Sequence, residues 1–214
     1  MIRTSHWIAP IGLLAAASGI AFAASTGVQE HEVQKMVASC AVCHGSKGEG
    51  IEARSAPRLA GLDAAYLESQ LNHFAAGARG TQPGDPFGPQ MYVIAQSLGP
   101  EERKRAAAFY SKRSASAPHA TIAKSAAQAR GVQTYDGCAA CHGADGMGNA
   151  DIGAPRLAGQ ADWYILASLK AYRAGGRGYD PADIAGQQMK QAATALADED
   201  LAPVSAYASA LGSN

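Results

Sequence analysis

Two short segments of this 214-residue chain place two thiols and an imidazole at the same spacing. Each segment reads Cys-x-x-Cys-His, and the residues are Cys40, Cys43, His44, Cys138, Cys141 and His142. Three kinds of chemistry use this arrangement: a thioredoxin-like dithiol, a zinc site, and covalent attachment of a c-type haem. The two motifs contain all four cysteines of the chain, so haem attachment would leave no thiol for a disulfide.

The surroundings of the motifs favour haem over the other two kinds of site. A redox dithiol of the thioredoxin type needs flanking strands, and no stretch of the sequence alternates with the period of a strand. A zinc ion bound by two Cys and one His at each motif would lack a fourth protein ligand. In haem attachment both thiols form thioethers and the following His binds the iron. The sequence therefore predicts two covalently attached haem c groups.

Methionines supply candidates for the second axial ligand of each iron. Met91 and Met189 each follow the histidine of their motif by 47 residues. Met36 and Met147 lie close in sequence to the attachment motifs, which places them beside the haem rather than across it. The alternative role for Met91 and Met189 is to fill gaps in a core. His/Met ligation raises the potential and leaves no open site, which favours electron transfer over catalysis. The predicted iron ligands are His44, Met91, His142 and Met189.

A proline and an arginine follow each motif at a fixed distance. Pro57 and Pro155 come 13 residues after their histidines, and their carbonyl groups suit the second ring N–H of a ligating histidine. Each would otherwise be an ordinary turn proline. Arg58 and Arg156 come next and suit a buried haem propionate, the alternative being a solvated loop arginine. Second candidates for the propionate are Arg79 and Arg177.

The sequence repeats itself when it is shifted by 98 residues. About 28 of 70 aligned positions are identical without a gap, which indicates two similar domains rather than a solenoid of short units. A polar, Pro-containing stretch between the repeats has the composition of a linker. We expect a signal peptide at 1–23, one domain at 24–112, a linker at 113–121 and a second domain at 122–214.

Each repeat has the pattern of helices joined by long loops. Helices are expected before each motif (30–39 and 125–135), after the caps Asp63 and Asp162, from Pro100, and after Asp198. Pro203 predicts that the last helix starts late or bends. The Gly- and Pro-rich stretches 45–56 and 77–90 are expected to be loops. His73 has no counterpart in the second repeat and is expected at the surface.

Composition and the N-terminus restrict the class of protein. Lys and Arg balance Asp and Glu at 18 each, which argues against a nucleic-acid binder. Arg3, a short apolar run and the segment Ala21–Ala23 are typical of a secretory signal peptide. The apolar run is shorter than the ~20 residues that span a bilayer, although an uncleaved anchor is the alternative. We therefore expect export to the periplasm.

The sequence resembles the dihaem cytochrome c4 family. The resemblance rests on the doubled haem motif, the Pro-Arg-Leu-Ala-Gly stretch before a Tyr-bearing helix, and a Met before the last helix. The likeness runs from about Glu30 to Leu211. It implies an all-α protein with two tandem class I cytochrome c domains related by pseudo-twofold symmetry. It also implies an electron carrier that serves a donor cytochrome or quinol-oxidising complex and a terminal oxidase, sometimes loosely attached to the membrane. The alternative is a dihaem enzyme or enzyme subunit, such as a peroxidase or a sulfur-compound oxidase.

Overall fold

The structure is a computed structural model, and it describes residues 17–122 and 128–212. Within those ranges the chain is helical, with two isolated β-bridges and no strand, as expected for an all-α protein. The elements are α1 (Ala17–His44), η1 (Glu52–Arg54), α2 (Ala64–Ala76), α3 (Gly88–Gln96), α4 (Pro100–Ser111), α5 (Gln128–His142), η2 (Ala150–Ile152), α6 (Asp162–Arg173), α7 (Ile184–Thr194) and α8 (Asp198–Ala210).

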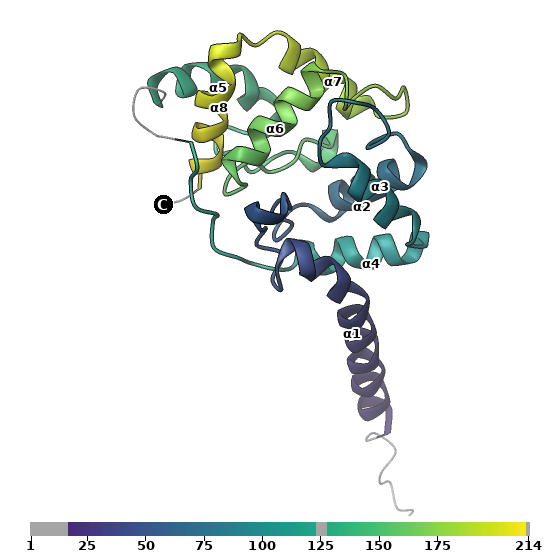
Figure 1. Cartoon of the computed structure of the whole chain (residues 1–214). Coiled ribbons are helices and arrows are strands. Elements are labelled where there is room, and N and C mark those ends of the chain that lie inside the picture. The colour runs from purple at the N-terminus through teal and green to yellow at the C-terminus, as the bar shows by residue number, and fades with distance from the viewer. Residues whose placement is uncertain (1–16, 123–127, 213–214) are drawn as a thin grey trace, which may run out of the picture.

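The helices form two units of matching design (Figure 1). In the first unit α2 packs against α3 and α4, and α1 crosses α4. In the second unit α5 crosses α8, while α6 packs against α7 and α8. Each unit has its own small core of buried aliphatic and tyrosine side chains. The core residues are Val37, Leu62, Leu67, Ala106, Ala107 and Tyr110 in the first unit, and Tyr135, Ile165, Leu169, Tyr172, Ala193, Leu201, Val204 and Ala208 in the second.

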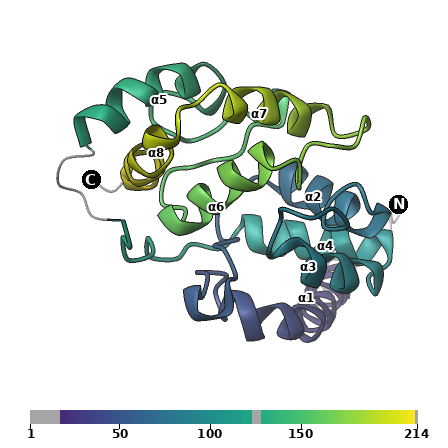
Figure 2. The ribbon, with the colours of Figure 1, turned by 45° about the horizontal axis from the view of Figure 1, so that its top comes forward.

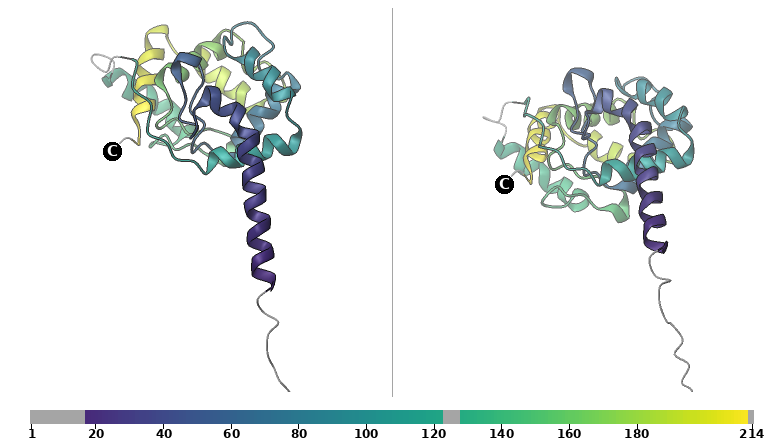
Figure 3. Two further views of the ribbon diagram at one scale, coloured as in Figure 1. Left: turned by 60° about the horizontal axis from the view of Figure 1, so that its bottom comes forward. Right: turned by 90° about the horizontal axis from the view of Figure 1, so that it is seen from below.

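The first helix is longer than the sequence pattern indicates. The predicted segment 30–39 lies inside α1, which begins at Ala17, ends at His44 and projects from the first unit (Figure 3). Residues 1–16, which make up most of the predicted signal peptide, lie outside the described residues. Among the helices described, none combines the length and apolar character needed to cross a bilayer. The predicted domain limits stay predictions.

The caps of the two middle helices differ. Asp63 caps α2 as predicted, because its carboxylate accepts the Tyr66 N–H at 3.0 Å. The prediction for Asp162 is wrong, since Ala161 takes the cap position and Asp162 is the first residue of α6. The buried carboxylate of Asp162 instead accepts the N–H groups of Thr121 and Ile122, each at 2.8 Å. It therefore fastens the end of the linker to the second unit.

The last helix does not start late, and the predicted bend at Pro203 stays a prediction. α8 begins at Asp198 and contains Pro203 in its interior. A Cβ atom on Gly131 would lie 2.5 Å from the Pro203 carbonyl oxygen. Glycine at this position therefore allows α5 to cross α8 closely beside the proline.

The helices α3 and α7 were not predicted. The expected loop 77–90 ends early, because α3 begins at Gly88. Asp85 accepts the Gly88 N–H at 3.1 Å, and Asp183 accepts the Gly186 N–H at 2.9 Å. Asp183 is the N-cap of α7, whereas Asp85 lies two residues before the cap position of α3. The repeated Asp-x-x-Gly pattern would therefore have indicated a helix start near each aspartate. The two helices matter because they carry Met91 and Met189.

Candidate haem sites

Each motif histidine stands at the C-terminal end of a helix and is held by a proline carbonyl. His44 Nδ1 lies 2.8 Å from the Pro57 oxygen, and His142 Nδ1 lies 2.8 Å from the Pro155 oxygen. A carbonyl oxygen only accepts, so Nδ1–H is the donor and the ring leaves Nε2 for a metal. Burial lowers the pKa of both imidazoles, although the bond to the carbonyl acts in the opposite direction. Both rings are therefore held as neutral ligands.

All four cysteines lie on the last turns of α1 and α5, and none of them is joined in a disulfide. Burial raises the pKa of the Cys40 and Cys138 thiols. Among the described residues no three His, Cys, Asp or Glu side chains gather as a zinc site requires. The strands that a thioredoxin-like site needs are also absent from this part of the chain. Covalent haem attachment fits these residues best.

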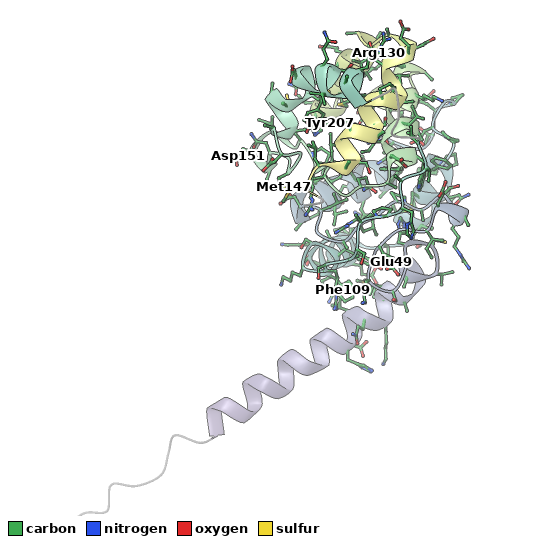
Figure 4. The ribbon with its side chains drawn as sticks, turned by 90° about the vertical axis from the view of Figure 1, so that its left-hand side faces the viewer. Glu49, Phe109, Arg130, Met147, Asp151 and Tyr207 are labelled. Carbon is green, nitrogen blue, oxygen red and sulfur yellow. The ribbon has the colours of Figure 1, made fainter. Side chains whose placement is uncertain are left out.

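The two candidate methionine ligands occupy equivalent places. Met91 lies on α3 and Met189 on α7, and both side chains are half-buried. Met147 is 49% exposed and lies at the rim of the second unit (Figure 4). Its repeat equivalent in the first unit is Glu49, so the two repeats do not share a methionine at this position. Met36 packs against the first core. Ligation by Met91 and Met189 stays a prediction supported by their equivalent positions.

The arginines next to the prolines bind backbone carbonyl groups. Arg58 Nε donates to the Ala60 oxygen at 2.9 Å, and Arg156 Nε makes the same bond to Ala158 at 2.8 Å. Arg58 Nη1 also reaches the oxygens of Ser116, in the linker, and Gly159, in the second unit. Burial, followed by the charge of Arg156, lowers the pKa of Arg58. The propionate role of both arginines stays a prediction, and Arg58 additionally holds the linker.

A second pair of arginines lies deeper between the units. Arg79 stacks on the Phe74 ring at 4.3 Å and donates to the Tyr164 hydroxyl at 3.3 Å, and Arg177 stacks on Tyr172 at 4.3 Å. Arg79 Nε is buried and lies 3.5 Å from the buried Asp85 carboxylate, although neither atom of this pair makes a hydrogen bond. Arg79 therefore has an acidic partner in Asp85, and the propionate role of Arg79 and Arg177 stays a prediction.

Comparison with known proteins agrees with these features. The sequence matches the Cytochrome c family at residues 31–112 and again at 128–211. Cytochrome c4 of Stutzerimonas stutzeri is 31% identical over 185 residues, which cover 81% of this chain and 85% of that protein. The chain belongs to the dihaem cytochrome c4 family. It therefore has two tandem cytochrome c domains and carries two covalently attached haem c groups.

Two further similarities show the range of the family. The crystal structure of reduced recombinant cytochrome c4 from Pseudomonas stutzeri has a TM-score of 0.69 and 29% identity, and the match covers 85% of this chain and 97% of that one. A thiosulfate dehydrogenase electron acceptor from Stutzerimonas stutzeri strain A1501 is 36% identical over 185 residues, which cover 81% of this chain and 79% of that protein. The cytochrome fold is thus shared with relatives whose named roles differ.

The two cytochrome domains meet through equivalent residues, as pseudo-twofold symmetry requires. Thr81 and Tyr179 occupy the same repeat position, and their hydroxyl groups lie 2.9 Å apart across the interface. The Tyr179 hydroxyl also donates to the Gly77 carbonyl at 2.8 Å. In Figures 1 and 2, α2 of the first domain and α6 of the second lie on the facing sides of the two domains.

Two interface features were missed or misassigned from the sequence. The backbones approach closely at Gly176, where a Cβ atom would lie 2.4 Å from the Asp85 nitrogen. The surface assignment of His73 is wrong, because its side chain is 20% exposed and its Nδ1 lies 3.6 Å from the Asp183 carboxylate of the second domain. Both positions look like ordinary surface or loop residues until the partner domain is in place.

Proposed function

We propose that this cytochrome is a periplasmic carrier that takes up single electrons from one protein and releases them to another. The observation that carries the proposal is the duplicated arrangement of a buried histidine held by a proline carbonyl and a methionine on an equivalent helix. When bound, haem supplies one-electron ferric/ferrous chemistry. Filling both axial positions with protein ligands would leave no place for a substrate.

The protein residues have separate tasks in this proposal. His44 and His142 would bind iron through Nε2, and the carbonyl groups of Pro57 and Pro155 would fix the ring orientation and raise the basicity of the ligand. Met91 and Met189 would supply the second protein ligand of each iron, and a thioether ligand would raise the potential. Arg79 and Arg177 neutralise acidic groups at the domain interface, so that charge is not buried without a partner.

The electron donor is the part of the proposal that the relatives sharpen. Two proteins named as thiosulfate dehydrogenase electron acceptors are each 36% identical to this chain, and a thiosulfate dehydrogenase structure aligns with 82% of it. The match covers only 39% of that structure. We propose a thiosulfate-oxidising enzyme as the donor. A donor cytochrome or a quinol-oxidising complex is the second candidate, supported by the cytochrome c4 relatives.

A terminal oxidase is the proposed acceptor. A protein named as a cbb3-type cytochrome c oxidase subunit, from Sinorhizobium medicae, is 30% identical over 166 residues, which cover 72% of this chain and 53% of that protein. That oxidase subunit therefore contains sequence similar to this chain, and we take this similarity as support for an oxidase as the acceptor. Export to the periplasm and loose attachment to the membrane belong to the same proposal, and cell fractionation with and without a salt wash would test both.

An anaerobic mixing experiment separates a carrier from an enzyme. The oxidised holoprotein is mixed with thiosulfate, with and without a thiosulfate dehydrogenase, and the haem absorbance is followed. A carrier becomes reduced only when the dehydrogenase is present. Catalytic consumption of thiosulfate or peroxide by the holoprotein alone would contradict the carrier role and support a dihaem enzyme. Reduction by a quinol-oxidising complex but not by the dehydrogenase would favour the second donor.

A further inference from the structure

The peptide group between Pro57 and Arg58 is hydrogen-bonded at both ends. Its carbonyl oxygen accepts the His44 Nδ1–H at 2.8 Å. Its N–H, which belongs to Arg58, donates to Gln160 Oε1 of the second domain at 3.0 Å. Gln160 Nε2 then donates to the Arg58 carbonyl at 2.9 Å, and the glutamine is only 5% exposed. Gln160 of the second domain is therefore hydrogen-bonded to the backbone segment of the first domain that holds His44.

The second domain lacks the equivalent hydrogen bonds among the described residues. Its equivalent peptide group joins Pro155 to Arg156, and no described residue accepts a hydrogen bond from the Arg156 N–H. Leu62 occupies the repeat position of Gln160, and its hydrocarbon side chain is buried in the first core. The His–Pro distance is nevertheless 2.8 Å in both domains. The two domains thus share the His–Pro hydrogen bond and differ in the next one, which the Arg58 N–H makes and the Arg156 N–H does not.

Hydrogen bonds in a chain polarise one another. When the Arg58 N–H donates to Gln160, the Pro57 carbonyl of the same peptide group becomes a stronger acceptor. A stronger acceptor draws the Nδ1–H of His44 further and raises the basicity of Nε2. A more basic axial ligand stabilises ferric iron relative to ferrous iron. The chain of bonds therefore acts in the direction of a lower potential in the first domain.

We propose that Gln160 is a positioning residue through which the second domain lowers the redox potential of the first-domain haem. The effect passes through the Pro57–Arg58 peptide group to His44, and it rests on the proposed ligation by His44. The missing bond at Arg156 makes the two sites inequivalent although their ligands are the same. The same contact makes the first site sensitive to the presence and placement of the second domain.

The variant Gln160→Leu tests this role, because leucine is the residue that the first repeat has at this position. The holoprotein is titrated while resolved haem resonances are followed by NMR. The first-domain haem is expected to shift to higher potential, with the second-domain haem unchanged. In the reduced protein the His44 Nδ1–H resonance is expected to move upfield, as a weakened hydrogen bond requires, while that of His142 stays in place.

Two further variants keep the test specific. Gln160→Glu retains an acceptor for the Arg58 N–H, so the His44 Nδ1–H resonance should stay at its original position or move downfield, opposite to Gln160→Leu. Tyr179→Phe removes interdomain hydrogen bonds that do not involve Arg58, so it should leave the His44 resonance and the first-domain potential unchanged. An upfield shift of the His44 resonance in Gln160→Leu alone distinguishes positioning of His44 from a general loosening of the interface.

Three outcomes would overturn the proposal: no change in Gln160→Leu, equal shifts at both haems, or the same shift in Tyr179→Phe. If the wild-type holoprotein gives two reversible one-electron waves and Gln160→Leu moves neither, only the positioning role fails. If the wild-type holoprotein gives no such waves, the proposed carrier function fails independently of Gln160.

Discussion

The two domains hold their motif histidines in the same way but support them differently. Both have a His–Pro hydrogen bond of 2.8 Å and a methionine at the same place on the penultimate helix. Gln160 of the second domain makes two hydrogen bonds to the Arg58 backbone of the first domain. Leu62 of the first domain makes no equivalent bond to the second domain. The repeats thus keep the predicted haem ligands and differ at Gln160 and Leu62, where only the first of these residues bonds to the other domain. Duplication of a site does not by itself produce two equivalent sites.

Removal of one pair of thiols should produce the largest effect. Cys138→Ser with Cys141→Ser is expected to lose about half of the haem, because thioether attachment in the second domain is abolished. The first domain should keep its haem, and mass spectrometry with haem quantification measures the ratio. The matched pair Cys40→Ser and Cys43→Ser should lose the other half. Full haem content in either double variant would refute covalent attachment at that motif.

Loss of a methionine ligand should come next. Met91→Ala or Met189→Ala should turn one haem high-spin and lower its potential by on the order of 0.2 V, within the ~0.8 V that axial ligands span. The weak ferric Fe–S charge-transfer band near the red edge of the visible spectrum should halve in each variant. Met147→Ala is the control, because this side chain is exposed. A normal spectrum in Met91→Ala would transfer the ligand role in the first domain to Met36.

A methyl group at the domain contact should have a moderate effect. Gly176→Ala places a Cβ atom 2.4 Å from backbone atoms of the first domain, and we expect about 1–3 kcal/mol of destabilisation from overpacking. Gly137→Ala is the control, because a Cβ atom there meets nothing within 4 Å and an alanine favours the helix by about 0.5–1 kcal/mol. Chemical denaturation of both holoproteins measures the difference, and equal stabilities would show that the contact is not tight.

Tyrosines of the two domains offer the finest comparison. The Tyr135 hydroxyl donates to the Gly143 carbonyl at 2.9 Å, whereas the Tyr110 hydroxyl lies 3.5 Å from the Val37 carbonyl. Tyr135→Phe should therefore cost about 1 kcal/mol of stability at pH 7, and Tyr110→Phe should cost less. Denaturant unfolding of the two variants measures this order, and an equal or reversed order would contradict it.

Tyr135 should also make the stability of the folded protein depend on pH in the alkaline range. Burial raises the pKa of Tyr135 to about 12 in the folded protein, above the ordinary value of 10. The unfolded chain therefore loses this proton first, and the stability that the neutral phenol supplies is complete below about pH 10 and is lost as the pH rises towards 12. Tyr135→Phe should flatten this part of the stability profile. An unchanged profile would mean that the hydroxyl does not titrate with unfolding.

The sequence was sufficient wherever a contact is local or set by chemistry. The 13-residue spacing and the need of a ligating histidine for an acceptor predicted the bonds to Pro57 and Pro155, which are present. The helix from Pro100 begins as predicted, because proline and acidic residues suit a first turn. The helices α3 and α7 could not be recognised from composition, because glycine and proline near their starts resemble loop residues. A repeated Asp-x-x-Gly pattern lies at both starts.

Contacts between the domains could not be predicted in the same way. His73, Gln160 and Gly176 lie in segments that read as a surface helix or a loop, and nothing in their local sequence indicates a partner about 100 residues away. Asp162 was assigned as a cap because it precedes an apolar helix pattern, yet its buried carboxylate binds the linker. Periodicity reports only which face of a helix is buried. It does not report what covers that face.

A spectroelectrochemical titration of the holoprotein, repeated under carbon monoxide, tests the saturated His/Met sites most directly. We expect two one-electron waves, low-spin spectra in both oxidation states and no rapid binding of carbon monoxide, because the proposed His and Met ligands would leave no open position at either iron. Rapid binding of carbon monoxide at either ferrous haem would contradict this expectation. It would show an open iron site and favour an enzyme over an electron carrier.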